Sequence, residues 1–196
     1  MIAKNTALQL FQARSNHNDG AWVNHSQNTA LAAEMIAKEA GLDSEAAYAY
    51  GLLHDIGRSF TKGQFLHITE GYQYLSDRGY EDAAQICLTH SFPIQNIYSY
   101  VGEIDIDERD QKYYQRKLQE IKYSDYDLLI QLCDTIATDC GFVFPEKRFV
   151  NLVFKYGFNY YTVDRWKRVL EIQDYFEKRT GKKTGEVLDA VKIPVL

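Results

Sequence analysis

The stretch from residue 22 to residue 57 decides the fold class, and it reads WVNHSQNTALAAEMIAKEAGLDSEAAYAYGLLHDIG. Side chains recur along it at the three- and four-residue steps of one helix face, namely at Trp22, His25, Thr29, Ala33, Ile36 and Ala40. Gly41 ends this first helix. Asp43 and Ser44 offer caps for a second helix, which stops by Gly57. Two successive helices are therefore predicted.

Helical spacing continues through the rest of the chain. Further helices are predicted over His67–Gly79, Glu81–Thr89, Ser124–Cys140, Pro145–Tyr156 and Thr162–Arg179. Five acids in the segment 103–110 favour a solvated loop and helix start over a metal site. The sequence predicts an all-α bundle of roughly seven to nine helices. We expect one domain over 1–196, with a metal-site core at about 20–145 and a helical extension at 146–196.

Composition narrows the class of protein and of partner. The 196 residues include 22 basic and 27 acidic side chains, a net charge of −5 that disfavours a nucleic acid duplex as partner. Three cysteines without a CxxC pair indicate free thiols. No signal peptide is predicted in Met1–Arg14, and no apolar run is long enough for a membrane span. We expect a cytoplasmic protein that acts on a small molecule. Its oligomeric state is open, and a homodimer is one possibility.

Two polar groups stand in apolar surroundings. His54 and Asp55 follow two leucines, and burying such a pair costs several kcal/mol unless both groups have partners. Asp134 lies in the run LLIQLCDTIA, with no Lys or Arg within one helical turn. A metal ion would supply the missing positive charge. Imidazole and carboxylate ligands together suit Fe, Mn, Zn or Ni.

The order of these residues is similar to that of a known family. His25, then the doublet in Leu-Leu-His-Asp-Ile-Gly, then Asp134 resembles the HD superfamily of metal-dependent phosphohydrolases. The resemblance implies a first metal ion with four ligands, which are His25, His54, Asp55 and Asp134. In dinuclear branches, Asp55 would bridge to a second ion held by His67 and His90. The alternative for these two histidines is a place in the core or on the surface. His17 has no counterpart and is predicted to lie in a loop or on the surface.

The resemblance also implies an activity. A nucleotide phosphoester or phosphoanhydride would be cleaved by a metal-activated hydroxide, with one or two divalent ions (Fe, Mn, Zn, Ni or Mg) as cofactor. Asp55 and Arg58 are the predicted catalytic residues. Branches that cleave cyclic dinucleotides carry Lys where this chain has Arg58, and a Gly-Tyr-Pro element that it lacks. Cleavage of cyclic dinucleotides is therefore not favoured.

Two cations near the doublet are predicted to contact substrate. The planar guanidinium of Arg58 suits a phosphoryl oxyanion, although a cation there can also satisfy carbonyls at a helix end. Lys62 is a second candidate for a phosphate contact, with a solvated surface charge as its alternative. The resemblance leaves two other functions open: a di-iron oxygenase, which would use the same six ligands, and a non-catalytic nucleotide sensor that keeps the fold. An intact ligand set speaks against the sensor.

Overall fold

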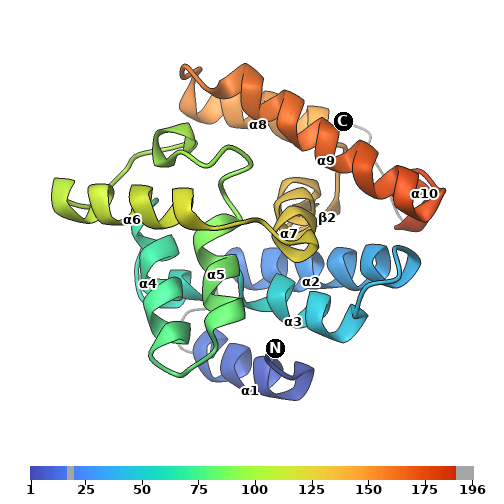
Figure 1. The fold of residues 1–196 in the computed structure, drawn as a ribbon, viewed down its shortest axis with the longest axis horizontal. Helices are drawn as coiled ribbons and strands as arrows, with labels where there is room; N and C mark the ends of the chain where they lie inside the picture. Colours follow the sequence, from blue (N-terminus) through green and yellow to red (C-terminus); the bar gives the residue numbers. More distant parts are fainter. Residues whose placement is uncertain (17–19, 189–196) are drawn as a thin grey trace.

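Helices make up most of the computed structural model, which describes residues 1–16 and 20–188 (Figure 1). The α-helices are α1 (Lys4–Ser15), α2 (Trp22–Glu39), α3 (Ser44–Leu53), α4 (Leu66–Ser76), α5 (Glu81–Thr89), α6 (Glu108–Glu120), α7 (Asp125–Ile136), α8 (Pro145–Tyr156), α9 (Thr162–Thr180) and α10 (Thr184–Val187). Two 3-10 helices, η1 (Ile56–Ser59) and η2 (Ile97–Ser99), lie between them. The predicted all-α fold class is confirmed.

Helices α2 and α3 form the centre of the bundle. A Cβ atom at Gly51 of α3 would lie 2.7 Å from the Cα atom of Ala30 of α2, so glycine is what permits this close approach. Helix α1 packs against α3 on one side, and α7 contacts both α2 and α3 on the other. Helices α8 and α9 form an outer layer beyond α7 (Figure 1). The residues around the centre of α7 are thus enclosed between two layers.

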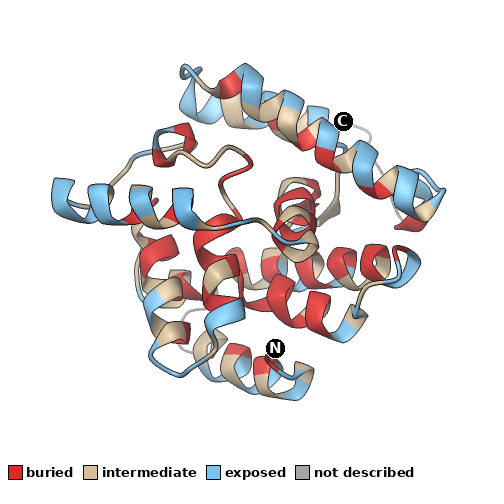
Figure 2. Cartoon of the chain, in the orientation of Figure 1, coloured by how far each residue is buried: buried red, intermediate tan, exposed pale blue. Residues whose placement is uncertain are grey.

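The hydrophobic core extends through both the predicted metal-site region and the predicted C-terminal extension. Figure 2 shows buried residues concentrated on α2, α3, α5 and α7. One cluster of buried side chains runs from Ile2 to Leu188 and includes Phe149 of α8 and Phe176 of α9. A second cluster, which includes Phe65 and Phe92, fills the space between α4, α5 and α6. The outer helices therefore share their core with the helices that carry the doublet.

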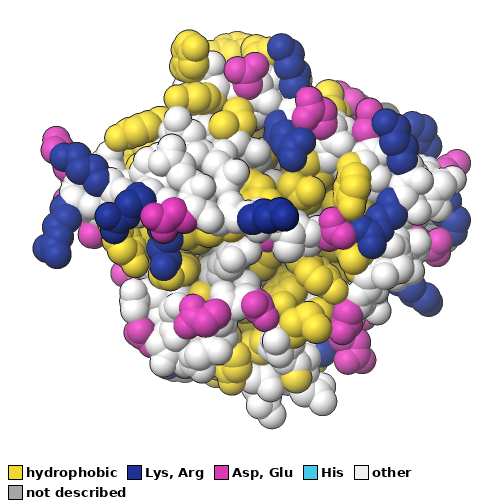
Figure 3. All heavy atoms as spheres, in the orientation of Figure 1, with side chains coloured by type: hydrophobic (Ala, Val, Ile, Leu, Met, Phe, Trp, Pro, Cys, Tyr) yellow, Lys and Arg dark blue, Asp and Glu magenta, His cyan; other side chains and the backbone are white. Residues whose placement is uncertain are grey.

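The surface carries charges of both signs. Figure 3 shows Lys, Arg, Asp and Glu side chains spread over one face, where no described histidine is visible. His54, His67 and His90 are all buried, and His25 is half-buried. His17 lies outside the described residues. In the ranges that the structure describes, no helix combines the length and the apolar character that crossing a membrane requires.

The structure departs from the sequence prediction around α7. The predicted helix over Ser124–Cys140 ends at Ile136, and two short antiparallel strands follow, β1 (Ala137–Thr138) and β2 (Gly141–Phe142). The backbone turns extended at Ala137, with φ −84° and ψ 145°, and this ends the helix. The hydroxyl of Thr138 donates to the carbonyl of Gly141 at 2.9 Å and closes the turn. The described residues contain ten α-helices against the seven to nine expected, because α1 and the four-residue α10 were not predicted.

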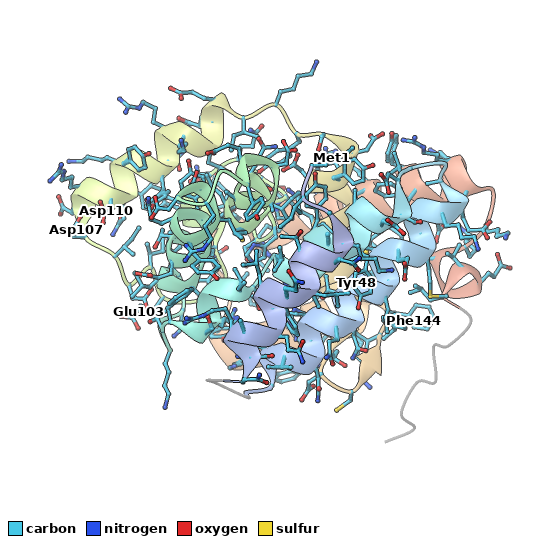
Figure 4. The ribbon with its side chains drawn as sticks, turned by 90° about the horizontal axis from the view of Figure 1, so that it is seen from below. Met1, Tyr48, Glu103, Asp107, Asp110 and Phe144 are labelled. Carbon is cyan, nitrogen blue, oxygen red and sulfur yellow. The ribbon has the colours of Figure 1, made fainter. Side chains whose placement is uncertain are left out.

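The acidic segment 103–110 is a loop and helix start, as expected, but one of its acids has a further role. Figure 4 shows Glu103, Asp107 and Asp110 along one edge of the molecule. Asp107 caps α6 by accepting from the Asp110 amide at 2.8 Å. Asp105 instead accepts from three backbone amides at the start of α4, those of Gln64 (2.7 Å), Phe65 (2.8 Å) and Leu66 (2.8 Å). Asp105 is therefore a long-range cap for the helix that carries His67.

Asp105→Ala should lower the free energy of unfolding by about 1 kcal/mol at pH 7, the usual value of an N-cap. Partial burial opposes its charge, but the three amide donors outweigh this and hold the pKa of Asp105 below its ordinary value. The stabilisation is therefore complete above the unfolded pKa of about 3.9 and disappears as the pH falls through the lower folded value. Urea denaturation from pH 7 to pH 3 measures both effects.

The matched control for this prediction is Glu120→Ala. Glu120 is an exposed acid of α6 whose ion pair with Arg116 is 4.0 Å long. Its removal should change stability by less than about 0.5 kcal/mol. Equal stability of the two variants at pH 7 would contradict the capping role of Asp105.

Candidate metal centre

The His54-Asp55 doublet forms the turn between α3 and η1. His54 is 1% exposed and Asp55 is 3% exposed. The flanking Leu53 and Ile56 are fully buried, and their burial draws the doublet into the core. The turn therefore places an imidazole and a carboxylate in the interior, where each needs a partner.

Gly57 allows α4 to pack directly against this turn. A Cβ atom at residue 57 would lie 1.9 Å from the carbonyl oxygen of His67 and 2.6 Å from the amide nitrogen of Gly71. Any larger residue would force α4 away from η1. The glycine of the Leu-Leu-His-Asp-Ile-Gly run thus sets the distance between Asp55 and His67.

A first cluster joins α2, the doublet and α7. The Nε2 atom of His25 lies 2.9 Å from Oδ1 of Asp134 and 3.3 Å from Nε2 of His54. The Nε2 atom of His54 lies 3.6 Å from Oδ1 of Asp134. It lies 3.8 Å from Oδ2 of Asp55. Ligand atoms from His25, His54 and Asp55 are close enough together to hold one metal ion.

A second cluster joins the doublet to α4 and to the end of α5. The Oδ1 atom of Asp55 lies 3.0 Å from Nε2 of His67 and 3.6 Å from Nε2 of His90. These three residues are all buried and could also hold a metal ion. Asp55 belongs to both clusters, with Oδ2 toward the first and Oδ1 toward the second.

Hydrogen bonds to the backbone orient the three buried imidazoles. His54 and His90 are the C-caps of α3 and α5, and their Nδ1 atoms donate to the carbonyls of Gly51 (2.7 Å) and Cys87 (2.8 Å). The Nδ1 atom of His67 bonds the carbonyl of Gln64 in the same way. A carbonyl only accepts, so the proton is on Nδ1, and Nε2 of a neutral ring presents a lone pair. This is the usual second hydrogen bond of a metal-ligating histidine.

The buried atoms of the second cluster lack partners among the described residues. The Oδ1 atom of Asp55 and the Nε2 atom of His67 have no hydrogen-bond partner there, although they lie 3.0 Å apart. Two acceptors facing each other repel unless a cation lies between them. A divalent ion would satisfy both, so the residues fit a metal.

Neighbouring groups keep the two carboxylates charged. Burial opposes the charge of Asp55, but Arg58, together with His54, outweighs it and holds the pKa of Asp55 well below the usual range. Burial likewise opposes the charge of Asp134, where hydrogen bonds from His25 and His54 hold the pKa well below its usual value. Both residues are therefore in the form that binds metal.

The three buried histidines differ in protonation. Burial lowers the pKa of His67, and it lowers the pKa of His90 to about 3, so both rings are neutral at pH 7. Burial also opposes protonation of His54, but the carboxylates of Asp55 and Asp134 outweigh it and raise the pKa. Metal binding at the first cluster would therefore compete with a proton on His54.

A family model for the HD domain matches residues 22–139, which is more than half of the chain. The chain belongs to the HD-domain family. That family consists mostly of metal-dependent phosphohydrolases. No curated protein and no solved structure matches the chain. The matched range contains all six predicted ligands and ends before α8.

A cleft opens over the metal centre of this HD domain. Its volume is about 820 Å³, and four of the predicted ligands line it: His25, Asp55, His90 and Asp134. Helices α8 and α9, which lie beyond the matched range, line the opposite side. Small-molecule sites commonly have volumes of roughly 300–1,000 Å³.

The two cations predicted to contact substrate are placed differently. Arg58 lines the cleft, and its Nε atom donates to Oδ2 of Asp55 at 2.6 Å. Arg58 therefore forms an ion pair with Asp55, and its contact with substrate stays a prediction. Lys62 is exposed and is not among the residues that line the cleft, so its contact with substrate stays a prediction.

Sequence reasoning missed the residues that α8 and α9 contribute to the cleft. They include Arg148, Lys155 and Arg165. The amphipathic pattern of the predicted helix over Thr162–Arg179 indicated packing, and Arg165 lies outside that pattern. Arg165 reaches the cleft because α9 packs beside the segment after α5, where its guanidinium bonds the carbonyls of Ser91 and Ser99.

Replacing His67 and His90 together by Ala should lower the metal content from about two ions to about one ion per chain. The ligands of the first cluster are unchanged, and the substitution removes both imidazoles of the second. Elemental analysis of protein loaded with Mn²⁺ and freed of excess ion measures this. Circular dichroism of both proteins provides the folding control. Unchanged metal content in the folded double variant would mean that no second ion binds there.

Proposed function

We propose that this HD domain hydrolyses a phosphoester or phosphoanhydride of a nucleotide, with two divalent ions held by the six ligands. The observation that carries the proposal is the placement of Asp55. Its two carboxylate oxygens face two separate clusters of histidines, and Asp55 itself lines the cleft. Sharing of one carboxylate by two metal sites is typical of centres that attack phosphoryl groups.

The cleft has the chemistry that a nucleotide requires. Four cationic side chains line it: Arg58, Arg148, Lys155 and Arg165. Aromatic rings line it as well, among them Trp22, Tyr100 and Trp166. Cations favour phosphoryl oxygens, and aromatic faces favour a base or the apolar face of a sugar. These features support a substrate with one charged end and one planar or apolar end.

Divalent ions bound at this centre would polarise a phosphoryl oxygen and supply an activated water as nucleophile. The chain's own part is to hold Asp55 and Asp134 ionised and to orient His54, His67 and His90 through their Nδ1 hydrogen bonds. Arg58 neutralises part of the charge on Asp55, and because it also lines the cleft we propose that it contacts a phosphoryl oxygen.

Asp55→Asn should lower phosphate release by more than about 100-fold, since even the outer partners of metal ligands are worth about 10- to 100-fold. The variant keeps the shape of the side chain but loses the charge that both clusters share. The measurement is phosphate release from a panel of nucleotides with Mn²⁺ present, in air and under anaerobic conditions. Helix content should not change.

The matched control is Asp127→Asn on α7. Asp127 is also a fully buried carboxylate, but it belongs to neither cluster and accepts hydrogen bonds from Thr89 at 2.6 Å and from Ser124 at 2.7 Å. This variant should lose stability and keep its turnover number. Phosphate release by Asp55→Asn at the parental rate would contradict the proposal. Turnover that requires O₂ would indicate an oxygenase, and tight nucleotide binding without metal or turnover would indicate a sensor.

A further inference from the structure

Arg165 is a cation in the cleft wall that forms no ion pair with a carboxylate of the described residues. It lies in the first turn of α9 and is half-buried. Its Nη1 atom donates to the carbonyl of Ser91 at 2.6 Å and to the carbonyl of Ser99 at 3.1 Å. Among the described residues, no carboxylate oxygen lies within 4.0 Å of its guanidinium. Both of its hydrogen-bond partners are neutral.

Burial makes this arrangement costly. Desolvation is the main cause that lowers the pKa of Arg165, to about 10, so the group still carries its charge at pH 7. Asp134 attracts this charge from beyond ion-pair distance, but the attraction does not outweigh the loss of solvation. Arg58, on the opposite side of the cleft, differs because Asp55 balances its charge. An anion that enters the cleft would remove the cost at Arg165.

The two carbonyls also fix the direction in which Arg165 presents its remaining donors. Both acceptors are bound by Nη1, so Nε and Nη2 make no hydrogen bond to any residue in the described part of the chain. These two nitrogens form the edge of the guanidinium that binds two oxygens of a phosphate side by side. Ser91 directly follows His90, so the anchored guanidinium is tied to the segment that carries a ligand of the second cluster.

We propose that Arg165 forms an oxyanion subsite of the cleft, in which Nε and Nη2 bind two oxygens of a phosphoryl group. The identity of that group as part of the substrate rests on the proposed function. Binding of the anion itself does not depend on the proposed function. It requires only the guanidinium, held in position by the two carbonyls. The ligand class is a phosphate monoester, a phosphoanhydride or free phosphate, which share the same tetrahedral oxygens.

Two tryptophans in the cleft can report phosphate binding through their fluorescence. Trp22 and Trp166 both line the cleft, and they are the only two tryptophans of the 196 residues. Titration of the metal-free protein with inorganic phosphate can therefore be followed by intrinsic fluorescence. We expect Arg165→Gln to weaken phosphate binding at least tenfold and Arg165→Lys to weaken it less, because Lys keeps the charge but loses the planar edge.

Arg168→Gln is the matched control. Arg168 lies on the same helix, is not among the cleft-lining residues and pairs with Glu171 at 3.0 Å. It should bind phosphate within twofold of the parent. Equal affinities of the Arg165→Gln and Arg168→Gln variants would overturn the proposal, and so would failure of the metal-free parent to bind phosphate.

A measurement on the parent protein covers the case in which the Arg165 variants do not fold. The ¹H–¹⁵N resonance of the Arg165 Nε group should shift when phosphate is added, and that of Arg168 should not. An unchanged Arg165 resonance would contradict the subsite. Phosphate binding at Arg165 without hydrolysis of any nucleotide would leave the subsite intact and refute the proposed function. Hydrolysis with Arg165 variants equal to Arg168→Gln would refute only the subsite.

Discussion

The buried carboxylate of Asp55 is the constraint on which the rest of the structure depends. A charge that is 3% exposed must be balanced, and four cationic or polarisable groups converge on it: Arg58, His54, His67 and His90. Each comes from a different place in the fold: Arg58 from η1, His54 from the end of α3, His67 from α4 and His90 from the end of α5. The packing of these elements is therefore organised around one carboxylate.

Helix ends do much of the positioning. His54 and His90 follow the last residues of α3 and α5, where helix carbonyls lack intrahelical partners. Their Nδ1 atoms bond such carbonyls, so one hydrogen bond both completes the helix and fixes the direction of Nε2. Each of these side chains thus combines a structural role at a helix end with its predicted role as a metal ligand. Substituting either histidine would affect the helix end as well as the metal site.

The local features of this arrangement could be predicted from the sequence, and the contacts between distant residues could not. The helix periods, the doublet behind two leucines and the lone Asp134 within an apolar run were each visible in a few neighbouring residues. The cap that Asp105 provides for α4 spans about forty residues of sequence, and no local pattern marks it. Arg165 reaches Ser91 across an even longer separation. Such contacts depend on how helices pack, which periodicity does not specify.

The central claim is that one carboxylate joins two metal sites, and an anomalous difference map of crystals grown with Mn²⁺ tests it most directly. The account predicts two peaks, one on each side of the Asp55 carboxylate. The first should lie beside His25, His54 and Asp134, and the second beside His67 and His90. A map with no peak in contact with Asp55, or with only one, would contradict the shared site.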